Sequence, residues 1–369
     1  MATEAKNKGL KEAKNNKKDE FYTQLSDIEK EVRHYKEHFK NKVVFCNCDD
    51  PRVSNFFHYF SYNFESLGLK KLITTCYKNQ ETDLFSEHNS EKAIYLEYNG
   101  DKNGDNVPNI EEIGIKHLKG DGDFRSSESI NLLTQADIIV TNPPFSLFRE
   151  YVAQLVEHDK KFLIIGNVNA ISYKDIFKLI REEKLWLGAS IHSGDREFGV
   201  PDDYPLNAAG SRIDNEGKKY IRVKGVRWFT NMDYDERHED LILYKKYSPE
   251  EYPKYENYDA INVDKTSEIP ANYSGLIGVP ITFLDKYNPD QFEIIALGIV
   301  GSIEFSSNRK MEILDKSGKP TNKFTWNAKG TLYRLYNPQK DKSPAFKDVE
   351  TGTLYSSIYA RVIIKNKKL

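Results

Sequence analysis

Cysteine is scarce in this sequence, since Cys46, Cys48 and Cys76 are the only three in 369 residues. They are too few and too clustered for a disulfide framework in a chain of this length. No run approaches the ~20 apolar residues that a membrane-spanning helix needs. The lysine-rich start of the chain also lacks an apolar signal segment. We therefore expect a cytoplasmic protein that does not contact a membrane.

Neither sign of charge dominates, because 54 Lys and Arg stand against 56 Asp and Glu, a net charge of −2. Any binding to nucleic acid would have to come from local clusters of positive charge. The hydrophobic fraction of 38%, with 12% aromatic residues, is ample for a packed core. The length predicts a core domain of roughly 200 residues and a second body of about 100.

The chain begins with a polar stretch, residues 1–19, that has almost nothing to bury and is predicted to be a disordered tail. A helix is expected over 21–39, where apolar residues recur every three or four positions. Apolar runs then alternate with helical periodicity, which is typical of a parallel sheet covered by helices. Strands are expected at 42–46, 72–76, 93–98, 113–118, 136–141, 162–168 and 220–229. Beyond about residue 245 the composition shifts to tyrosine, proline and short strands, and we expect a domain boundary there.

The most informative segment is a buried strand, 137–141, that runs directly into Asn142, Pro143, Pro144 and Phe145. An amphipathic helix is expected to begin just after it. In open parallel sheets ligands bind beyond the carboxyl ends of the strands, and the two prolines make the loop rigid. This order of elements favours a catalytic loop over an incidental strand-end turn.

The tetrapeptide suits chemistry on an exocyclic amino group, which is a poor nucleophile because its lone pair is delocalised into the ring. If Asn142 Oδ1 and the Pro143 carbonyl accept hydrogen bonds from the amine, its lone pair is freed to attack a sulfonium methyl in line. The ring of Phe145 would give a flat apolar face to a base rotated out of a duplex.

The sequence at this point resembles S-adenosylmethionine-dependent amino-methyltransferases, whose Asn/Asp/Ser-Pro-Pro-aromatic motif matches Asn142–Phe145. Further segments narrow the resemblance to the EcoRI-type adenine-specific DNA methyltransferase family. These are FCNCDDP at 45–51, SNF at 54–56, KHLKGDGDFR at 116–125 and GVRWFTN at 225–231. The resemblance extends over most of the chain after residue 19, although Asn-Pro-Pro-Phe alone also occurs in RNA and protein-glutamine methyltransferases.

The resemblance implies a doubly wound, mostly parallel, Rossmann-like sheet. Residues 20–245 would form the S-adenosylmethionine-dependent catalytic domain and 246–369 a target-recognition and DNA-binding region. The implied activity is site-specific methylation of adenine N6 in a flipped-out base of double-stranded DNA, by a monomer that works in restriction-modification beside a cognate restriction endonuclease. An RNA or cytosine-N4 amino-methyltransferase and a catalytically inactive DNA-binding module of the same fold remain as alternatives.

The cofactor would be held where the first strand meets its helix and at one further loop. At the first place we expect Asn47, Asp49, Asp50 and Pro51, although Asp49 and Asp50 could equally cap the helix. Serine and asparagine stand there in place of the glycines usual in the wider superfamily. At the second loop, Asp123 and Phe124 are expected to bind the cofactor's adenine, unless this segment is only a turn. No acidic residue follows the second strand, so nothing in the sequence identifies what binds the ribose.

A basic cluster is a candidate DNA contact. Lys218, Lys219, Arg222, Lys224 and Arg227 fall within ten residues, in a stretch with no acidic residue and with interleaved aromatics. Alternation with apolar residues predicts a strand with one basic face, which would contact phosphates. The alternative is an ordinary solvated strand face.

Three patterns that could bind metal are weak, and we expect no metal site. His34 and His38 lie one turn apart on a helix crowded with charges and lack a third ligand. The loop from Asp101 to Glu112 has calcium-like spacing, but it lacks the required glycine and is flanked by strands. Cys46 and Cys48 have no second pair, so small core residues are the simpler interpretation.

Overall fold

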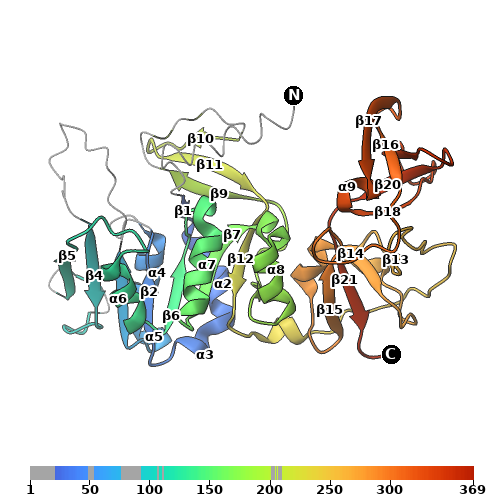
Figure 1. Cartoon of the computed structure of the whole chain (residues 1–369). Coiled ribbons are helices and arrows are strands. Elements are labelled where there is room, and N and C mark those ends of the chain that lie inside the picture. The colour runs from blue at the N-terminus through green and yellow to red at the C-terminus, as the bar shows by residue number, and fades with distance from the viewer. Residues whose placement is uncertain are drawn as a thin grey trace. The chain divides into compact units, whose positions relative to one another are not determined.

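The structure is a computed structural model, and it describes residues 21–48, 54–75, 93–105, 108–109, 112–200, 204, 206 and 210–369. These residues form two compact units (Figure 1). The first is drawn from Met1–Ala170 and Leu185–Tyr234, and the second from Ile171–Lys184 and Asp235–Leu369. A single boundary near residue 245 does not anticipate the inserted segment of the second unit.

The first unit is built on an eight-stranded sheet in the order β5-β4-β3-β2-β6-β7-β12-β8. Its strands are β2 (Val43–Cys46), β3 (Lys71–Thr75), β4 (Ile94–Tyr98), β5 (Ile113–His117), β6 (Ile138–Thr141), β7 (Lys161–Asn167), β8 (Trp186–Leu187) and β12 (Val226–Thr230). The four central strands, β3, β2, β6 and β7, are parallel. The neighbours on both sides pair antiparallel. The expectation of a mostly parallel sheet therefore holds at the centre and is wrong at the edges, where antiparallel strands extend the sheet.

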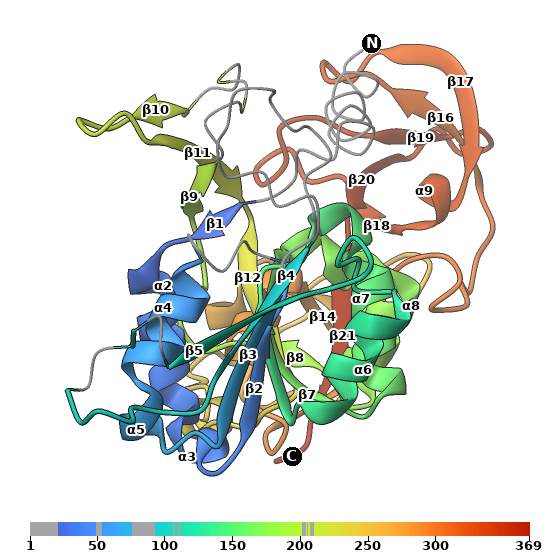
Figure 2. The same ribbon diagram turned by 90° about the vertical axis from the view of Figure 1, so that its left-hand side faces the viewer.

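Helices cover both faces of this sheet, as Figure 2 shows. One face carries α2 (Leu25–Val32), α3 (Lys36–Phe39), α4 (Asn55–Tyr62) and α5 (Phe64–Leu67); the other carries α6 (Ser127–Gln135) and α7 (Phe148–Glu157). The expected helix over 21–39 begins at Leu25 and passes through a 3-10 turn, Arg33–Tyr35, between α2 and α3. Burial of both faces explains why the central strands read as unbroken apolar runs.

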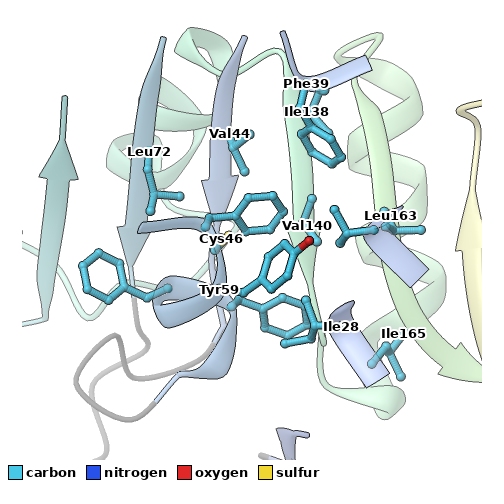
Figure 3. Close-up of a cluster of buried hydrophobic side chains, with 14 of the residues drawn as sticks. Ile28, Phe39, Val44, Cys46, Tyr59, Leu72, Ile138, Val140, Leu163 and Ile165 are labelled. Atoms are coloured by element: carbon cyan, nitrogen blue, oxygen red, sulfur yellow. The ribbon is translucent and has the colours of Figure 1, made fainter. Parts of the chain in front are cut away.

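The core of the first unit lies between the sheet and the helices α2 to α5. Alternate residues of the central strands point toward those helices (Figure 3), because successive side chains of a strand face opposite sides. The labelled members are Ile28, Phe39, Val44, Cys46, Tyr59, Leu72, Ile138, Val140, Leu163 and Ile165. The interpretation of Cys46 as a small core residue is confirmed by its burial in this cluster.

A second, four-stranded sheet of the first unit has the order β1-β9-β11-β10. Its strands are β1 (Tyr22–Thr23), β9 (Asp195–Val200), β10 (Arg212–Ile213) and β11 (Lys219–Lys224). The single strand predicted over 220–229 is therefore two strands, β11 and β12, in different sheets. The chain breaks at Gly225, where φ is +69° and a Cβ atom would lie 2.9 Å from Val168 Cγ1. Only glycine combines that backbone conformation with such a close approach.

The second unit is mainly β. One sheet has the order β13-β14-β21-β15 and the other β17-β16-β19-β20-β18. The strands are β13 (Ile261–Asn262), β14 (Ile277–Pro280), β15 (Phe292–Leu297), β16 (Lys310–Leu314), β17 (Pro320–Trp326), β18 (Leu332–Leu335), β19 (Phe346–Asp348), β20 (Leu354–Ile358) and β21 (Arg361–Asn366). The inserted segment contributes α8 (Lys174–Arg181), and a short helical turn, α9 (Asn327–Gly330), precedes β18. Along the described residues, no helix is long and apolar enough to cross a membrane.

Candidate functional site

The site begins where two parallel strands, β2 and β6, end side by side. The hydroxyl of Thr141, the last residue of β6, donates to the main-chain carbonyl of Asn47, the residue after β2. The Tyr151 hydroxyl, from α7, donates to Asn47 Oδ1. Burial, with the nearby Cys48 thiol as a second cause, raises the pKa of Tyr151 well above its usual value, so this phenol stays a neutral donor. The β2 and β6 ends are thereby fixed to one another and to α7.

Asn142, the residue after β6, is only 5% exposed and has its two polar ends in different environments. Its Nδ2 donates to the Phe21 carbonyl over 2.7 Å. Its Oδ1 is buried and has no hydrogen-bond partner. Since a carbonyl only accepts, the amide must point its NH2 group at Phe21 and its oxygen away. Leaving a buried acceptor unsatisfied costs about 1 to 3 kcal/mol, so such an atom calls for an explanation.

The rest of the tetrapeptide forms a short turn before α7. Pro143 is buried, while Pro144 and Phe145 are partly exposed. A 3-10 turn spans Phe145–Leu147, and α7 proper starts at Phe148. The Pro144 carbonyl accepts from the Leu147 amide over 2.9 Å. Among the described backbone amides none donates to the Pro143 carbonyl, which leaves that oxygen available beside the Asn142 acceptor.

Aromatic rings gather around Phe145. The Phe21 ring lies 5.8 Å from the Phe145 ring, edge to face at 73°. Phe21 also lies 5.9 Å from Phe198 and 6.3 Å from Tyr204, measured between ring centroids. The Phe145 ring therefore borders an apolar wall that residues from three distant parts of the sequence build.

Asp123 and Phe124 lie close to the same strand ends. The Phe124 ring packs 5.1 Å from the ring of Tyr151, and the Phe124 carbonyl accepts from Gln154 Nε2 over 3.0 Å. Both carboxylate oxygens of Asp123 accept hydrogen bonds from Arg125, one from Nε over 2.9 Å and one from NH2 over 2.6 Å. The Asp123 carboxylate raises the pKa of Arg125 above its usual value. The structure thus brings Asn47 and Phe124 together through Tyr151, a residue that the sequence reasoning missed, and Asn47 in turn contacts Thr141, which directly precedes the tetrapeptide.

Three of the residues expected to bind the cofactor, Asp49, Asp50 and Pro51, lie outside the described residues. The helix that follows them is α4, and Ser54 caps it by accepting from the Phe56 amide over 3.2 Å. The serine that replaces an expected glycine therefore has a local role at the helix start.

The basic cluster divides between two environments. On β11, Arg222 and Lys224 are exposed, whereas Ile221 before them is buried in the core and Val223 between them is partly buried. Lys218 is exposed and pairs with Glu216 over 2.8 Å, and Lys219 is half-buried and donates to the Tyr204 carbonyl.

Arg227 departs from the expectation of a basic strand face. It belongs to β12, is 4% exposed, and donates to the carbonyls of Val226 and His192 over 2.8 and 2.6 Å. The placement of Arg227 on that face is wrong because Gly225 turns the chain into the large sheet just before it.

The weak metal patterns have local partners. His38 contacts the Asp233 carbonyl over 2.8 Å. Glu112 is buried and its Oε1 accepts from the amides of Lys102 and Asn103, at 2.7 and 3.2 Å. These carboxylate oxygens thus help to close their own loop. No group of three or more candidate ligands for a metal ion occurs in the part of the chain that the structure describes.

Comparison with known proteins matches residues 9–367 to the family described as "Adenine-specific methyltransferase EcoRI". The chain is 54% identical over 297 residues to the Type II methyltransferase M.EcoRI of Escherichia coli, covering 80% of this chain and 90% of that protein. Type II methyltransferases of Mycoplasma genitalium and Mycoplasma pneumoniae are each 41% identical, over 290 and 289 residues, covering 77% of this chain and 84% and 83% of their own lengths. The chain therefore belongs to the EcoRI family of adenine-specific methyltransferases.

Proposed function

We propose that this protein transfers a methyl group from S-adenosylmethionine to N6 of an adenine in double-stranded DNA, at one short recognition sequence. The observation that carries the proposal is the buried, unpartnered Oδ1 of Asn142, held in place by the bond from Nδ2 to Phe21. An acceptor that the protein itself leaves unsatisfied is suited to a donor that arrives with the substrate. The exocyclic amine of adenine is such a donor.

In this proposal the Asn142 Oδ1 and the Pro143 carbonyl each accept one hydrogen of the target amine. Two acceptors placed in advance draw the nitrogen toward tetrahedral geometry and localise its lone pair. Because the loop is rigid and partly buried, they need little reorganisation at the moment of reaction. Asn142 and Pro143 therefore act on the amine, and Phe145 offers its partly exposed ring to the face of a flipped base.

The strand ends of the first unit fit S-adenosylmethionine, which when bound supplies an electrophilic methyl group. In addition to Asn142 Oδ1, the hydroxyl oxygens of Thr23 and Thr74 are buried without hydrogen-bond partners. Thr23 precedes α2 and Thr74 lies near the end of β3, next to β2 in the sheet. Buried polar atoms without partners are what a polar ligand would satisfy.

We assign the cofactor contacts as the sequence predicts them: Asn47, Asp49, Asp50 and Pro51 at the end of β2, and Asp123 with Phe124 at the other loop. Phe124 has the clearer support, since no group among the described residues accepts from its amide. Asp123 would accept from the cofactor's adenine while Arg125 holds its carboxylate in place.

For the DNA, we assign phosphate contacts to Arg222 and Lys224 on β11, with Lys218 and Lys219 beside them. The strand β11 belongs to the same sheet as β1, which directly follows Phe21, and the Phe21 carbonyl binds Asn142 of the catalytic loop. We assign target recognition to the second unit, and propose a monomer that acts in the cytoplasm beside a cognate restriction endonuclease.

Methyl transfer from labelled S-adenosylmethionine to a library of duplex, single-stranded and RNA oligonucleotides tests the proposal. Digestion and chromatography should find N6-methyladenine, confined to duplexes that share one short sequence. Label in N4-methylcytosine or in RNA would support the alternative amino-methyltransferases. Binding to DNA without transfer of label would support the inactive module.

A further inference from the structure

The residue that fixes the catalytic amide comes from far along the chain. Phe21 and Asn142 are separated by 121 positions, yet the Phe21 carbonyl lies 2.7 Å from Asn142 Nδ2. Phe21 directly precedes β1, a strand of only two residues. The contact therefore ties the catalytic loop to a short strand at the edge of the second sheet.

The position of that carbonyl is set by the main chain around it. Tyr22 and Thr23 pair with Gly199 and Phe198 of β9. The Thr23 carbonyl accepts from Asn55 Nδ2 over 2.7 Å, which anchors the strand to the start of α4. The Phe21 carbonyl thus has little freedom to follow Asn142 if the amide rotates.

The same residue acts on the other end of the tetrapeptide through its ring. The Phe21 ring packs edge to face on Phe145 and contacts the ring of Phe198. One residue therefore sets the amide plane of Asn142 by its carbonyl and supports the stacking ring by its side chain.

We propose that Phe21 is a positioning residue for methyl transfer, and that its carbonyl makes this chain require asparagine at position 142. This inference rests on the proposed function, since it assumes that Asn142 Oδ1 receives the amine. The motif of the wider enzyme class tolerates aspartate in this place. Here an ionised carboxylate would set an anionic oxygen against the Phe21 carbonyl oxygen, with no proton between them.

The variant Asn142→Asp tests the requirement by its pH profile. At pH 8 we expect kcat to fall at least ~10²-fold, because the carboxylate cannot donate to Phe21 and loses its orientation. The facing carbonyl disfavours the charged form and so raises the pKa of the introduced carboxyl. Activity should therefore recover toward pH 6, where the protonated group donates to Phe21 as the amide does. The wild-type enzyme should show no such rise on the acid side.

The failure of this inference differs from the failure of the proposed function. If Asn142→Ala loses turnover but Asn142→Asp keeps the wild-type kcat at pH 8, the requirement for a donor at Phe21 is overturned while the role of the acceptor stands. If Asn142→Ala itself turns over normally, the proposed function falls first. Thermal melting at pH 6, where the protonated carboxyl has nearly the shape of the amide, checks that the variant folds.

A second pair of variants tests the strand directly. Tyr22→Pro removes an amide of β1 and restricts the backbone of Phe21, so it should displace the carbonyl. Tyr22→Ala keeps that main chain and is the matched control. We expect Tyr22→Pro to lower kcat ~10-fold or more with KM for DNA within about threefold, and Tyr22→Ala to stay near wild type. Equal losses in both variants, or a change confined to KM or melting temperature, would overturn the positioning role.

Discussion

Glu31 and Asn142 are both buried polar side chains of the first unit, but they use their hydrogen-bonding capacity in opposite ways. Glu31, on α2, is fully buried and accepts from the Tyr35 hydroxyl over 2.8 Å, from the Ala189 and Ser190 amides over 2.8 and 2.7 Å, and from the Ser190 hydroxyl. Asn142 makes one bond and keeps its oxygen open. The saturated group holds the fold together, and the open one is available to a substrate.

The loop that donates to Glu31 approaches its carboxylate closely. A Cβ atom at Gly188 would lie 2.2 Å from Glu31 Oε1, so only glycine lets the loop approach the carboxylate. Burial and the Glu31 carboxylate raise the pKa of Tyr35 well above its usual value, which keeps the phenol a donor. Both carboxylate oxygens of Glu31 are therefore already occupied by donors of the protein itself.

The largest effect is expected at the open group. Asn142→Ala should lower the rate of methyl transfer roughly 10² to 10³-fold, because one preorganised acceptor is lost. The dissociation constant for S-adenosylmethionine should stay within a few-fold, and the melting temperature should not fall. Turnover close to wild type in the folded variant would mean that the open Asn142 oxygen has no more part in the chemistry than the saturated Glu31 carboxylate.

The reverse outcome is expected at the saturated group. Glu31→Ala leaves the Tyr35 hydroxyl and two amides without an acceptor and should lower the free energy of unfolding by roughly 2 to 4 kcal/mol. Urea denaturation measures this loss, with Glu31→Gln as the milder control. Methyl transfer per folded molecule should be unchanged. A variant with the wild-type denaturation midpoint but reduced chemistry would contradict the assignment of Glu31 to structure.

Asp123 lies between these extremes, because its carboxylate is paired but partly exposed. Asp123→Ala should raise the dissociation constant for S-adenosylmethionine about tenfold, through loss of one charge-assisted hydrogen bond. Arg125→Gln keeps the Asp123 carboxylate and removes only the guanidinium that holds it in place, so it should weaken the affinity less than Asp123→Ala does. Calorimetry that finds equal affinities in wild type and Asp123→Ala would mean that other residues hold the cofactor's adenine.

The smallest effect concerns the basic strand. Arg222→Gln and Lys224→Gln should each reduce the slope of log K for DNA against log salt by about 1. Arg227→Gln should leave the slope unchanged and lower the stability of the fold instead, because the Arg227 guanidinium donates to two main-chain carbonyls. Fluorescence anisotropy over a salt series measures the slopes. Slopes equal to that of the wild type in all three variants would argue that β11 does not contact DNA phosphates.

The sequence was informative where structure follows from local pattern. The apolar runs predicted β2, β3, β6 and β7, and the order of strand, Asn142–Phe145 and helix located the candidate catalytic loop. The strands predicted at 93–98 and 113–118 are confirmed as β4 and β5, which pair with one another.

Contacts between distant residues were not predictable in the same way. Phe21 lies at the edge of a lysine-rich tail and gives no sign that it meets Asn142. Arg227 closely follows the basic residues of β11 in the sequence, and the backbone at Gly225 shows that it enters another sheet. Tyr151 looks like any apolar-face residue of α7 until its hydroxyl is seen to meet Asn47. Such pairings depend on the tertiary fold and have no local signal.

The helix α8 determines which segments must be exchanged together when the second unit of one relative replaces that of another. The chain leaves the first unit after Ala170, contributes α8 to the second, returns at Leu185, and leaves again after Tyr234. Ile176, Phe177 and Ile180 bury the apolar side of that helix. A recombination event that swapped only the segment after Tyr234 would bring a new unit to a helix shaped for the old one. A chimera between relatives therefore needs both the inserted segment and the C-terminal segment from one parent.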